Sequence, residues 1–365
     1  MNKPTNRFLA LSGADVNHIP HWEHWSNPDA ETYITGIDHY AKPLSARKKL
    51  LDFYPDINLP LPHNDDPIPR PDINLADKGI DNDKIAVRWG DSLTGTWQHG
   101  EALFINEEDV LKFSPIKQLD FTQYPVVENH NYSASDAELY KMFIKRFELL
   151  DVPVAAEYCA DMSCFYNTAI MWPILTFGWE NFLLNSEEKE FERIMDEFAQ
   201  INRRVFNIFT ELPTHFVLCH DDLCTTRGPV CSPRWMNKFL YPRYEEYCGM
   251  LHKANKKVFF IGDGCIDAVA DNLVACGFDG LISEPYTDFK LLSKRYPHLV
   301  LAGEGDNRIL SSNNKDAVYK MVESMTQTAE NVPGYFYCIG NHIPWNIKPD
   351  IVKYYLDCCL KLGAK

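Results

Sequence analysis

The sequence has few basic residues for its length, and this deficit argues against several classes of function. Lysine and arginine total 36 of 365 residues against 51 aspartates and glutamates, a formal net charge of −15. Proteins that bind nucleic acid or anionic membranes in general need a basic surface. No run of about 18 apolar residues is present, as a membrane-spanning helix would require, and the first 20 residues lack the apolar core of a secretory signal. We therefore expect a cytoplasmic protein that binds neither nucleic acid nor membrane.

The sequence also lacks paired cysteines and phosphate-binding glycine motifs. Its eleven cysteines form an odd set with no Cys-x-x-Cys pair, which is typical of neither a disulfide framework nor a zinc ribbon. No Gly-x-Gly-x-x-Gly and no Gly-x-x-x-x-Gly-Lys-Ser/Thr follows an expected strand. Nucleotide-binding folds are therefore disfavoured.

From about residue 150, short β-type runs alternate with longer amphipathic helical patterns. Strands are expected at 151–157, 214–219, 257–261, 280–283, 298–302 and 335–338, with two earlier ones at 18–23 and 53–61. Helices are expected at about 168–184, 187–211, 266–276, 287–295, 314–331 and 349–362, and from Ser232-Pro233. Strands that are apolar on both faces and alternate with helices indicate a parallel sheet covered by helices. Eight such strands favour a (β/α)8 TIM-type barrel in a single domain of residues 1–365 with an N-terminal extension.

Residues 62–150 interrupt this alternation and are predicted to be an insertion. Six prolines between positions 55 and 71 exclude a helix there. Residues 84–98 alternate around polar turn residues and predict a hairpin, which a helical extension follows.

Active sites of such barrels form at the carboxyl ends of the strands, so the residue that follows each strand is informative. Ionisable or amide side chains follow every expected strand: Glu23-His24, Asn64 to Asp66, Glu157, His220 to Asp222, Asp263, Glu284, Asp306-Asn307 and Asn341-His342. His220 is notable because it follows an apolar run and precedes two aspartates. A His–Asp pair can tune proton transfer or bind a divalent metal ion. The sequence therefore predicts a polar, acid-lined cavity.

Further short motifs are spread along most of the chain. They are Arg7 to Ala10, Ile19-Pro20, His220 to Asp222, Arg227 to Pro229, Ser232-Pro233, Phe239, Tyr241-Pro242, Tyr244, Gly262 to Gly264, Gly277 to Gly280, Glu284-Pro285, Gly303, and Gly340 to Pro344 with Asp350. Together these motifs resemble the uroporphyrinogen decarboxylase superfamily. The resemblance is strongest over 214–345. It implies a distorted (β/α)8 barrel, which agrees with the strand count.

Two departures separate this chain from parts of the superfamily. True decarboxylases carry an arginine-rich Met-Arg-Gln-Ala-Gly-Arg segment after the first strand, whereas residues 23–27 here contain no arginine. Methyltransferases that act on coenzyme M bind zinc through His-x-Cys after the fifth strand, and residues 260–263 here read Phe-Ile-Gly-Asp. The resemblance therefore implies the remaining branch, whose members transfer a methyl group from a small donor to the Co(I) corrinoid of a partner protein. Aryl methyl ethers of the guaiacol or vanillate type are the expected donors.

In this interpretation acids and histidines surround the departing oxygen, namely His220, Asp222, Asp263, Glu284 and His342, with Glu23 and Glu157 in support. Trp22 or Trp25, Asn341 and Trp345 are the candidates for binding the substrate. His220, Asp222, Glu284 and His342 are candidate zinc ligands, although no His-x-x-x-His spacing is present. Two alternatives stay open: a cofactor-independent decarboxylase of a small acid and a non-catalytic scaffold subunit.

A corrinoid is too large for the packed interior of a barrel, so its carrier protein is expected to dock at the rim. Arg227 and Arg308 lie in rim loops and are predicted to contact the carrier. The contact is expected to be small, polar and transient. The sequence leaves a homodimer open.

Overall fold

The structure is a computed structural model. It describes residues 10, 16–25, 27–55, 57–58, 62, 64–70, 80–81, 84–88, 95–99, 104, 106–118, 135–148, 165–214 and 216–364. No helix in these ranges is long and apolar enough to cross a membrane.

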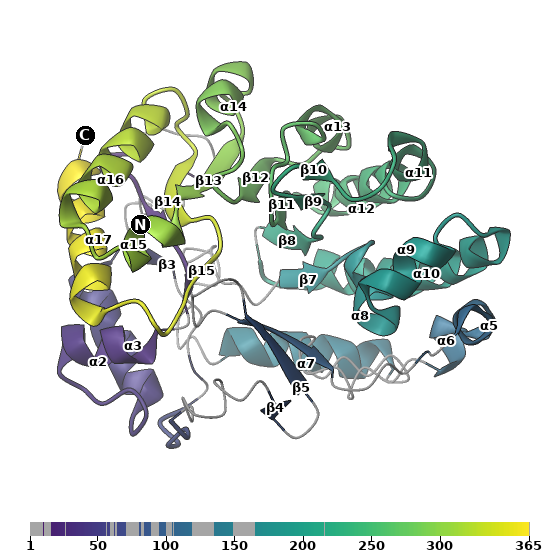
Figure 1. The fold of residues 1–365 in the computed structure, drawn as a ribbon, viewed down its shortest axis with the longest axis horizontal. Coiled ribbons are helices and arrows are strands. Elements are labelled where there is room, and N and C mark those ends of the chain that lie inside the picture. The colour runs from purple at the N-terminus through teal and green to yellow at the C-terminus, as the bar shows by residue number, and fades with distance from the viewer. Residues whose placement is uncertain are drawn as a thin grey trace.

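An eight-stranded, all-parallel sheet forms the centre of the molecule and curls so that helices lie along its outer face (Figure 1). In spatial order its strands are β3 (Ile57–Asn58), β1 (His21–Trp22), β14 (Tyr335–Ile339), β13 (Val300–Gly305), β12 (Gly280–Ser283), β11 (Lys257–Gly262), β8 (Phe216–His220) and β7 (Phe165–Asn167). Every neighbouring pair is parallel. Within the described ranges no pairing joins the two edge strands, β3 and β7. The α/β class and the parallel sheet are confirmed.

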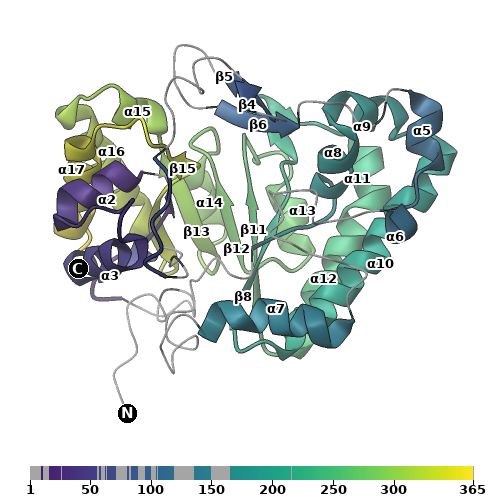
Figure 2. The same ribbon diagram turned by 90° about the horizontal axis from the view of Figure 1, so that it is seen from below.

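The helices follow the amphipathic patterns of the sequence. They are α2 (Pro28–Thr35), α3 (Pro43–Phe53), α5 (Glu107–Lys112), α6 (Pro115–Gln118), α7 (Asp136–Glu148), α8 (Met171–Phe177), α9 (Trp179–Asn185), α10 (Lys189–Glu211), α11 (Pro233–Phe239), α12 (Tyr241–Lys253), α13 (Ala270–Ala275), α14 (Phe289–Arg295), α15 (Asn307–Ser311), α16 (Lys315–Ala329) and α17 (Pro349–Leu362). In Figure 2, α2, α3 and α15–α17 lie on the left of the sheet and α8–α12 on its right, while α13 and α14 lie over the central strands. As expected, the Ser232 side chain caps α11 by accepting from the Trp235 N–H.

Small sheets complete the structure. In one, β5 (Lys84–Arg88) pairs antiparallel with β4 (Ile80–Asp81) and with β6 (Gly95–His99), so the expected hairpin forms. In another, β15 (His342–Ile343) pairs with β2 (His24–Trp25). In the third, β9 (Cys224–Thr225) pairs with β10 (Gly228–Pro229).

Some expected elements differ from the structure. Of the strand expected at 53–61, residues 57–58 form β3, whereas Phe53 ends α3. Residues 56 and 59–61 lie outside the described residues. The single helix at 168–184 is two helices, α8 and α9, which Gly178 separates with a positive φ of 81°. The strand at 151–157 lies outside the described residues.

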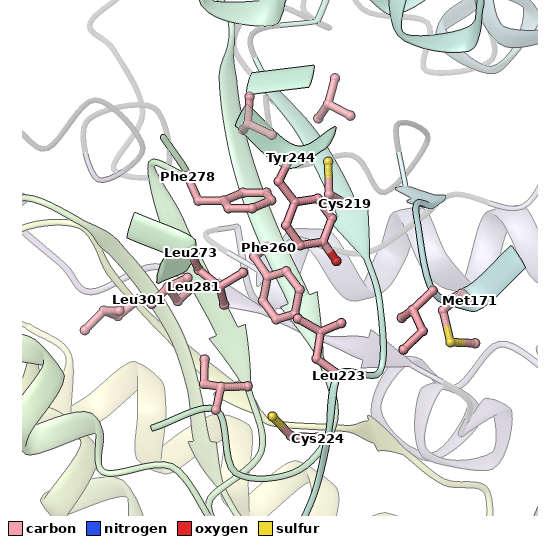
Figure 3. Close-up of a cluster of buried hydrophobic side chains, with 14 of the residues drawn as sticks. Met171, Cys219, Leu223, Cys224, Tyr244, Phe260, Leu273, Phe278, Leu281 and Leu301 are labelled. Carbon is pink, nitrogen blue, oxygen red and sulfur yellow. The ribbon is translucent and has the colours of Figure 1, made fainter. Parts of the chain in front are cut away.

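Two apolar layers pack against the sheet. The larger lies between the sheet and the helices, where Tyr244, Phe260 and Phe278 pack edge to face (Figure 3). The smaller lies inside the curl and includes Phe216, Leu218, Phe259, Ile282 and Trp22. Side chains alternate between the two faces of a strand. Asp263 and Glu284 stand two positions after Ile261 and Ile282 of the inner layer, so they also face inward and help to form the site. Glu304 of β13 departs from this alternation after Gly303, whose φ is 128°, and accepts from Thr328 of α16.

Candidate active site

Three side chains from neighbouring strand ends meet in one hydrogen-bonded cluster. Asn341 Nδ2 donates to Asp263 Oδ1 and Oδ2 at 3.3 Å each, and to Glu284 Oε1 at 3.1 Å. Asp263 follows β11, Glu284 follows β12 and Asn341 follows β14. All three are partly buried. One amide group therefore holds two carboxylates beside each other at the carboxyl ends of the sheet.

His220 and Asp222 extend this cluster on the β8 side. His220 Nε2 lies 3.1 Å from Asp222 Oδ1, and the same carboxylate oxygen accepts from the backbone N–H of Asp263 at 3.1 Å. The side chains of His220 and Asp222 are 18% and 23% exposed, so the pair is reachable from solvent. The predicted His–Asp pair is thus present in the structure and adjoins Asp263.

Asn341 also orients His342. Its Oδ1 accepts from the His342 backbone N–H at 2.7 Å and lies 2.8 Å from His342 Nδ1. Because an amide oxygen only accepts, this contact assigns the proton to Nδ1 and leaves Nε2 as the acceptor nitrogen. Burial lowers the pKa of His342, so the imidazole is neutral at neutral pH.

Burial and neighbouring charge make Asp263 a proton donor near neutral pH. Burial first, then the carboxylates of Asp222 and Glu284, raise the pKa of Asp263 to about 7. Burial opposes protonation of His220, but the Asp222 carboxylate outweighs it and raises the pKa of His220. Burial likewise opposes ionisation of Asp222, yet His220 holds its pKa below the usual value. The cluster thus combines an ion pair with a neutral carboxylic acid, an arrangement suited to general acid catalysis.

Backbone geometry at two glycines fixes Glu284. The N–H of Gly264, whose φ is 79°, donates to Glu284 Oε2 at 2.7 Å. At Gly340 an added Cβ would lie 2.4 Å from the Cα of Glu284, so only glycine allows this close approach. These contacts hold the carboxylate against Asn341.

Asp221, between His220 and Asp222, serves the fold instead of the cluster. Its buried carboxylate accepts from the backbone N–H groups of Ala169 and Met171 at 2.7 Å each, and from the Tyr244 hydroxyl at 2.5 Å. Burial raises its pKa to about 6. Asp221 therefore fixes the start of α8 beside β8.

One of the predicted catalytic residues that the structure describes, Glu23, does not join the cluster. Glu23 is fully buried on the helix side of the sheet, where it accepts from the Tyr355 hydroxyl of α17 at 2.8 Å and contacts His21 Nε2 at 2.5 Å. Trp22 occupies the inward position of β1, so Glu23, one residue later, faces outward, and its supporting role stays a prediction. Glu157 lies outside the described residues.

The predicted binding residues lie in different environments. Trp22 lies inside the curl and lines a small cavity below the cluster, whereas Trp25 is buried in the outer apolar layer. Trp345 is partly buried in the turn after β15. Sequence reasoning missed the remaining cavity residues, which are Ile261, Ile282, Cys338, Ile339 and Gly340. Ile261 and Ile282 stand two positions before Asp263 and Glu284, so strand alternation was the signal that would have found them.

The two predicted docking arginines are both at the surface. Arg227 is exposed between β9 and β10. Arg308 is 65% exposed, and its guanidinium donates to both oxygens of Asp306 and lies 4.8 Å above the Tyr286 ring.

The four candidate zinc ligands do not converge on one point. Within the described ranges, no group of three or more His, Cys, Asp or Glu side chains is arranged to hold a metal ion. The hydrogen bonds given above occupy the oxygens of Asp222 and Glu284 that face the cluster. The hydrogen-bonded arrangement of these residues is suited to proton transfer.

Comparison with known protein families shows which family the chain belongs to. The model of the family uroporphyrinogen decarboxylase (URO-D) matches residues 180–362, half of the chain, which includes the whole cluster. The chain belongs to the uroporphyrinogen decarboxylase family, and the resemblance read from the sequence is confirmed.

Twenty-six solved chains match the structure. One is a methyltransferase from Methanosarcina mazei, with 14% sequence identity, a TM-score of 0.58 and coverage of 98% of both chains. At 14% sequence identity, the similarity between the two structures is evidence for a shared fold alone. No curated protein matches the chain.

Proposed function

We propose that this protein is a methyltransferase that moves a methyl group from a small aryl methyl ether to the corrinoid of a partner protein. The observation that carries the proposal is the convergence of Asp263, the His220–Asp222 pair and Glu284 at the carboxyl ends of the sheet. The family and the methyltransferase with the same fold support a reaction of this type.

An ether donor suits this cluster because its departing oxygen needs a proton. The methyl–oxygen bond breaks with both electrons left on the oxygen, and an unprotonated phenolate is a poor leaving group. Asp263 donates a proton to that oxygen, while protonated His220, held by Asp222, stabilises the developing negative charge. A quaternary ammonium donor leaves as a neutral amine and would gain nothing from the acid.

The reacting methyl group must be reachable from outside the sheet. The corrinoid, when bound, supplies a Co(I) nucleophile that accepts the methyl group. The interior of the curl is filled by residues such as Phe216, Leu218 and Phe259, so a corrin does not fit below the cluster. The partly exposed His220 and Asp222 keep the cluster open to a carrier docked at the rim. Arg227 and Arg308 are proposed to contact that carrier.

The decarboxylase alternative is less well supported by the site. A substrate carboxylate would need a basic partner, and the cluster of described residues contains neither lysine nor arginine. Arg308 is the nearest rim candidate, and Asp306 already binds it.

The finer fold assignment is also a proposal. We infer that β3 and β7 belong to a closed (β/α)8 barrel in one domain, with residues 62–150 as an insertion. The parallel order of the eight strands supports this arrangement.

Product analysis tests the proposed function directly. Incubation with guaiacol and a reduced corrinoid protein should release catechol, detected by mass spectrometry, and should methylate the corrinoid. The heat-inactivated protein serves as the control. Absence of the corresponding phenol with every methoxyarene and corrinoid protein tried would contradict the proposal.

The pH dependence of this reaction should follow the ionisation of Asp263. The acid is active when protonated, so kcat/KM should fall as the pH rises through about 7. In Glu284→Gln one source of repulsion is gone, the pKa of Asp263 falls, and the alkaline decline should move to lower pH. Asp52→Asn, an exposed charge change on α3, should leave the profile unchanged. An unmoved profile in Glu284→Gln would mean that another group controls the decline.

A further inference from the structure

We propose that the site binds methyl donors that carry no negative charge, and that the indole N–H of Trp22 donates to a neutral acceptor atom of the donor. The inference rests on the proposed function, because it names the class of donor taken by the same cluster. Of the expected donors, it favours guaiacol-type ethers, which are uncharged, over vanillate-type ethers, which carry a carboxylate.

The first argument is the charge of the cluster. The carboxylates of Asp263 and Glu284 share the Asn341 amide group at 3.1–3.3 Å, and Asp222 accepts from the backbone N–H of Asp263 at 3.1 Å. His220 offsets only the charge of Asp222, and His342 is neutral, so above about pH 7 Asp263 and Glu284 carry two uncompensated negative charges. An anionic group beside them would lie in a repulsive field in a partly buried place.

The second argument is an unpaired donor below the cluster. Trp22 is 6% exposed, and its Nε1 has no hydrogen-bond partner among the described residues. A buried N–H without a partner lowers the stability of the folded protein. Trp22 lines the same cavity as Asn341, whose amide holds Asp263 and Glu284. A bound acceptor atom at this place would satisfy the indole.

The third argument is the shape and lining of that cavity. Apart from Trp22 and Asn341 its walls are Ile261, Ile282, Cys338, Ile339 and Gly340. Its volume of about 10 Å³ is that of roughly one water site. It therefore admits a single polar atom of the donor, such as a hydroxyl oxygen, while the rest of the donor lies outside it.

Two isosteric probes test this selection without any corrinoid. Vanillate and its amide, 4-hydroxy-3-methoxybenzamide, differ in charge but scarcely in shape, and calorimetry gives both affinities. At pH 8 the amide should bind at least about 10-fold more tightly. At pH 6 the preference should shrink, because Asp263 is then protonated while vanillate stays ionised. The charged and titratable groups that face Asp263 are Asp222, His220 and Glu284, with the Arg308–Asp306 pair at the rim.

Variants separate the two parts of the proposal. Asp263→Asn should remove the pH dependence of the preference, and Asp52→Asn should keep it. Trp22→Phe preserves an apolar ring but not the N–H, so it should weaken binding of the amide by about 2- to 10-fold. Unaltered affinity in a folded Trp22→Phe protein would overturn the role of the indole.

Equal affinities for the two probes at pH 8, or binding of neither, would overturn the charge selection. Demethylation of guaiacol is measured separately on the same preparation. The proposed function can therefore stand when the charge selection fails, and it fails when no methoxyarene is demethylated.

Discussion

Asp263→Asn should lower kcat for ether demethylation by about 100- to 10,000-fold, the range expected when a general acid is lost. Asparagine has the size and hydrogen-bonding capacity of the protonated aspartic acid, so it can keep the contact with Asn341 but cannot release a proton. The donor should therefore still bind, and KM should change little. Steady-state kinetics between pH 6 and 8 check this result.

The pH profile distinguishes a lost acid from a general disturbance. In Asp263→Asn the decline above pH 7 should disappear and the rate should be low at every pH. Asp52→Asn controls for the removal of one negative charge and should resemble the unmodified protein. A variant within about threefold of normal turnover would show that another group protonates the departing oxygen.

His220→Ala should lower turnover by at least about 100-fold, because it removes the positive partner of Asp222 and leaves that carboxylate unpaired beside Asp263. Like-charge repulsion should then raise the pKa of Asp263. What activity remains should persist to higher pH than in the unmodified protein. Rates measured across the pH range, with circular dichroism to establish folding, test both effects.

His298→Ala provides the matched control for that variant. His298 is an exposed histidine that contacts the ring of Tyr296 and precedes the amino end of β13, whereas the cluster lies at the carboxyl ends of the strands. Its removal should leave turnover and pH profile unaltered. Normal turnover in a correctly folded His220→Ala protein would remove His220 from the mechanism.

Much of the sheet could be predicted because its strands are apolar on both faces. β8, β11, β12, β13 and β14 lie within one to three residues of the predicted runs, and the helices α10, α14, α16 and α17 follow their amphipathic stripes. These elements could be predicted because the spacing of apolar residues along the sequence indicates which face of each strand or helix is buried. Short strands were harder: β3 and β7 pair over two and three residues, and their sequences carry no long apolar run.

The sequence by itself was sufficient to predict which polar residues lie at the carboxyl ends of the strands. His220, Asp222, Asp263, Glu284 and Asn341 each follow a buried run, and parallel strands bring such ends together. Chain order alone therefore predicted an acid-lined site with a His–Asp pair. It also predicted the family through motifs in the region that the family model matches.

Only the tertiary structure decided which polar residues share the site and which serve the fold. Glu23 and Asp221 stand next to site residues in sequence, yet each faces outward and binds a buried tyrosine, Tyr355 or Tyr244. The direction of a strand side chain depends on register, and a shift of one residue reverses it. The pKa of Asp263 likewise depends on burial and on carboxylates 41 and 21 positions away in the chain. Such distances exist only once the sheet has formed.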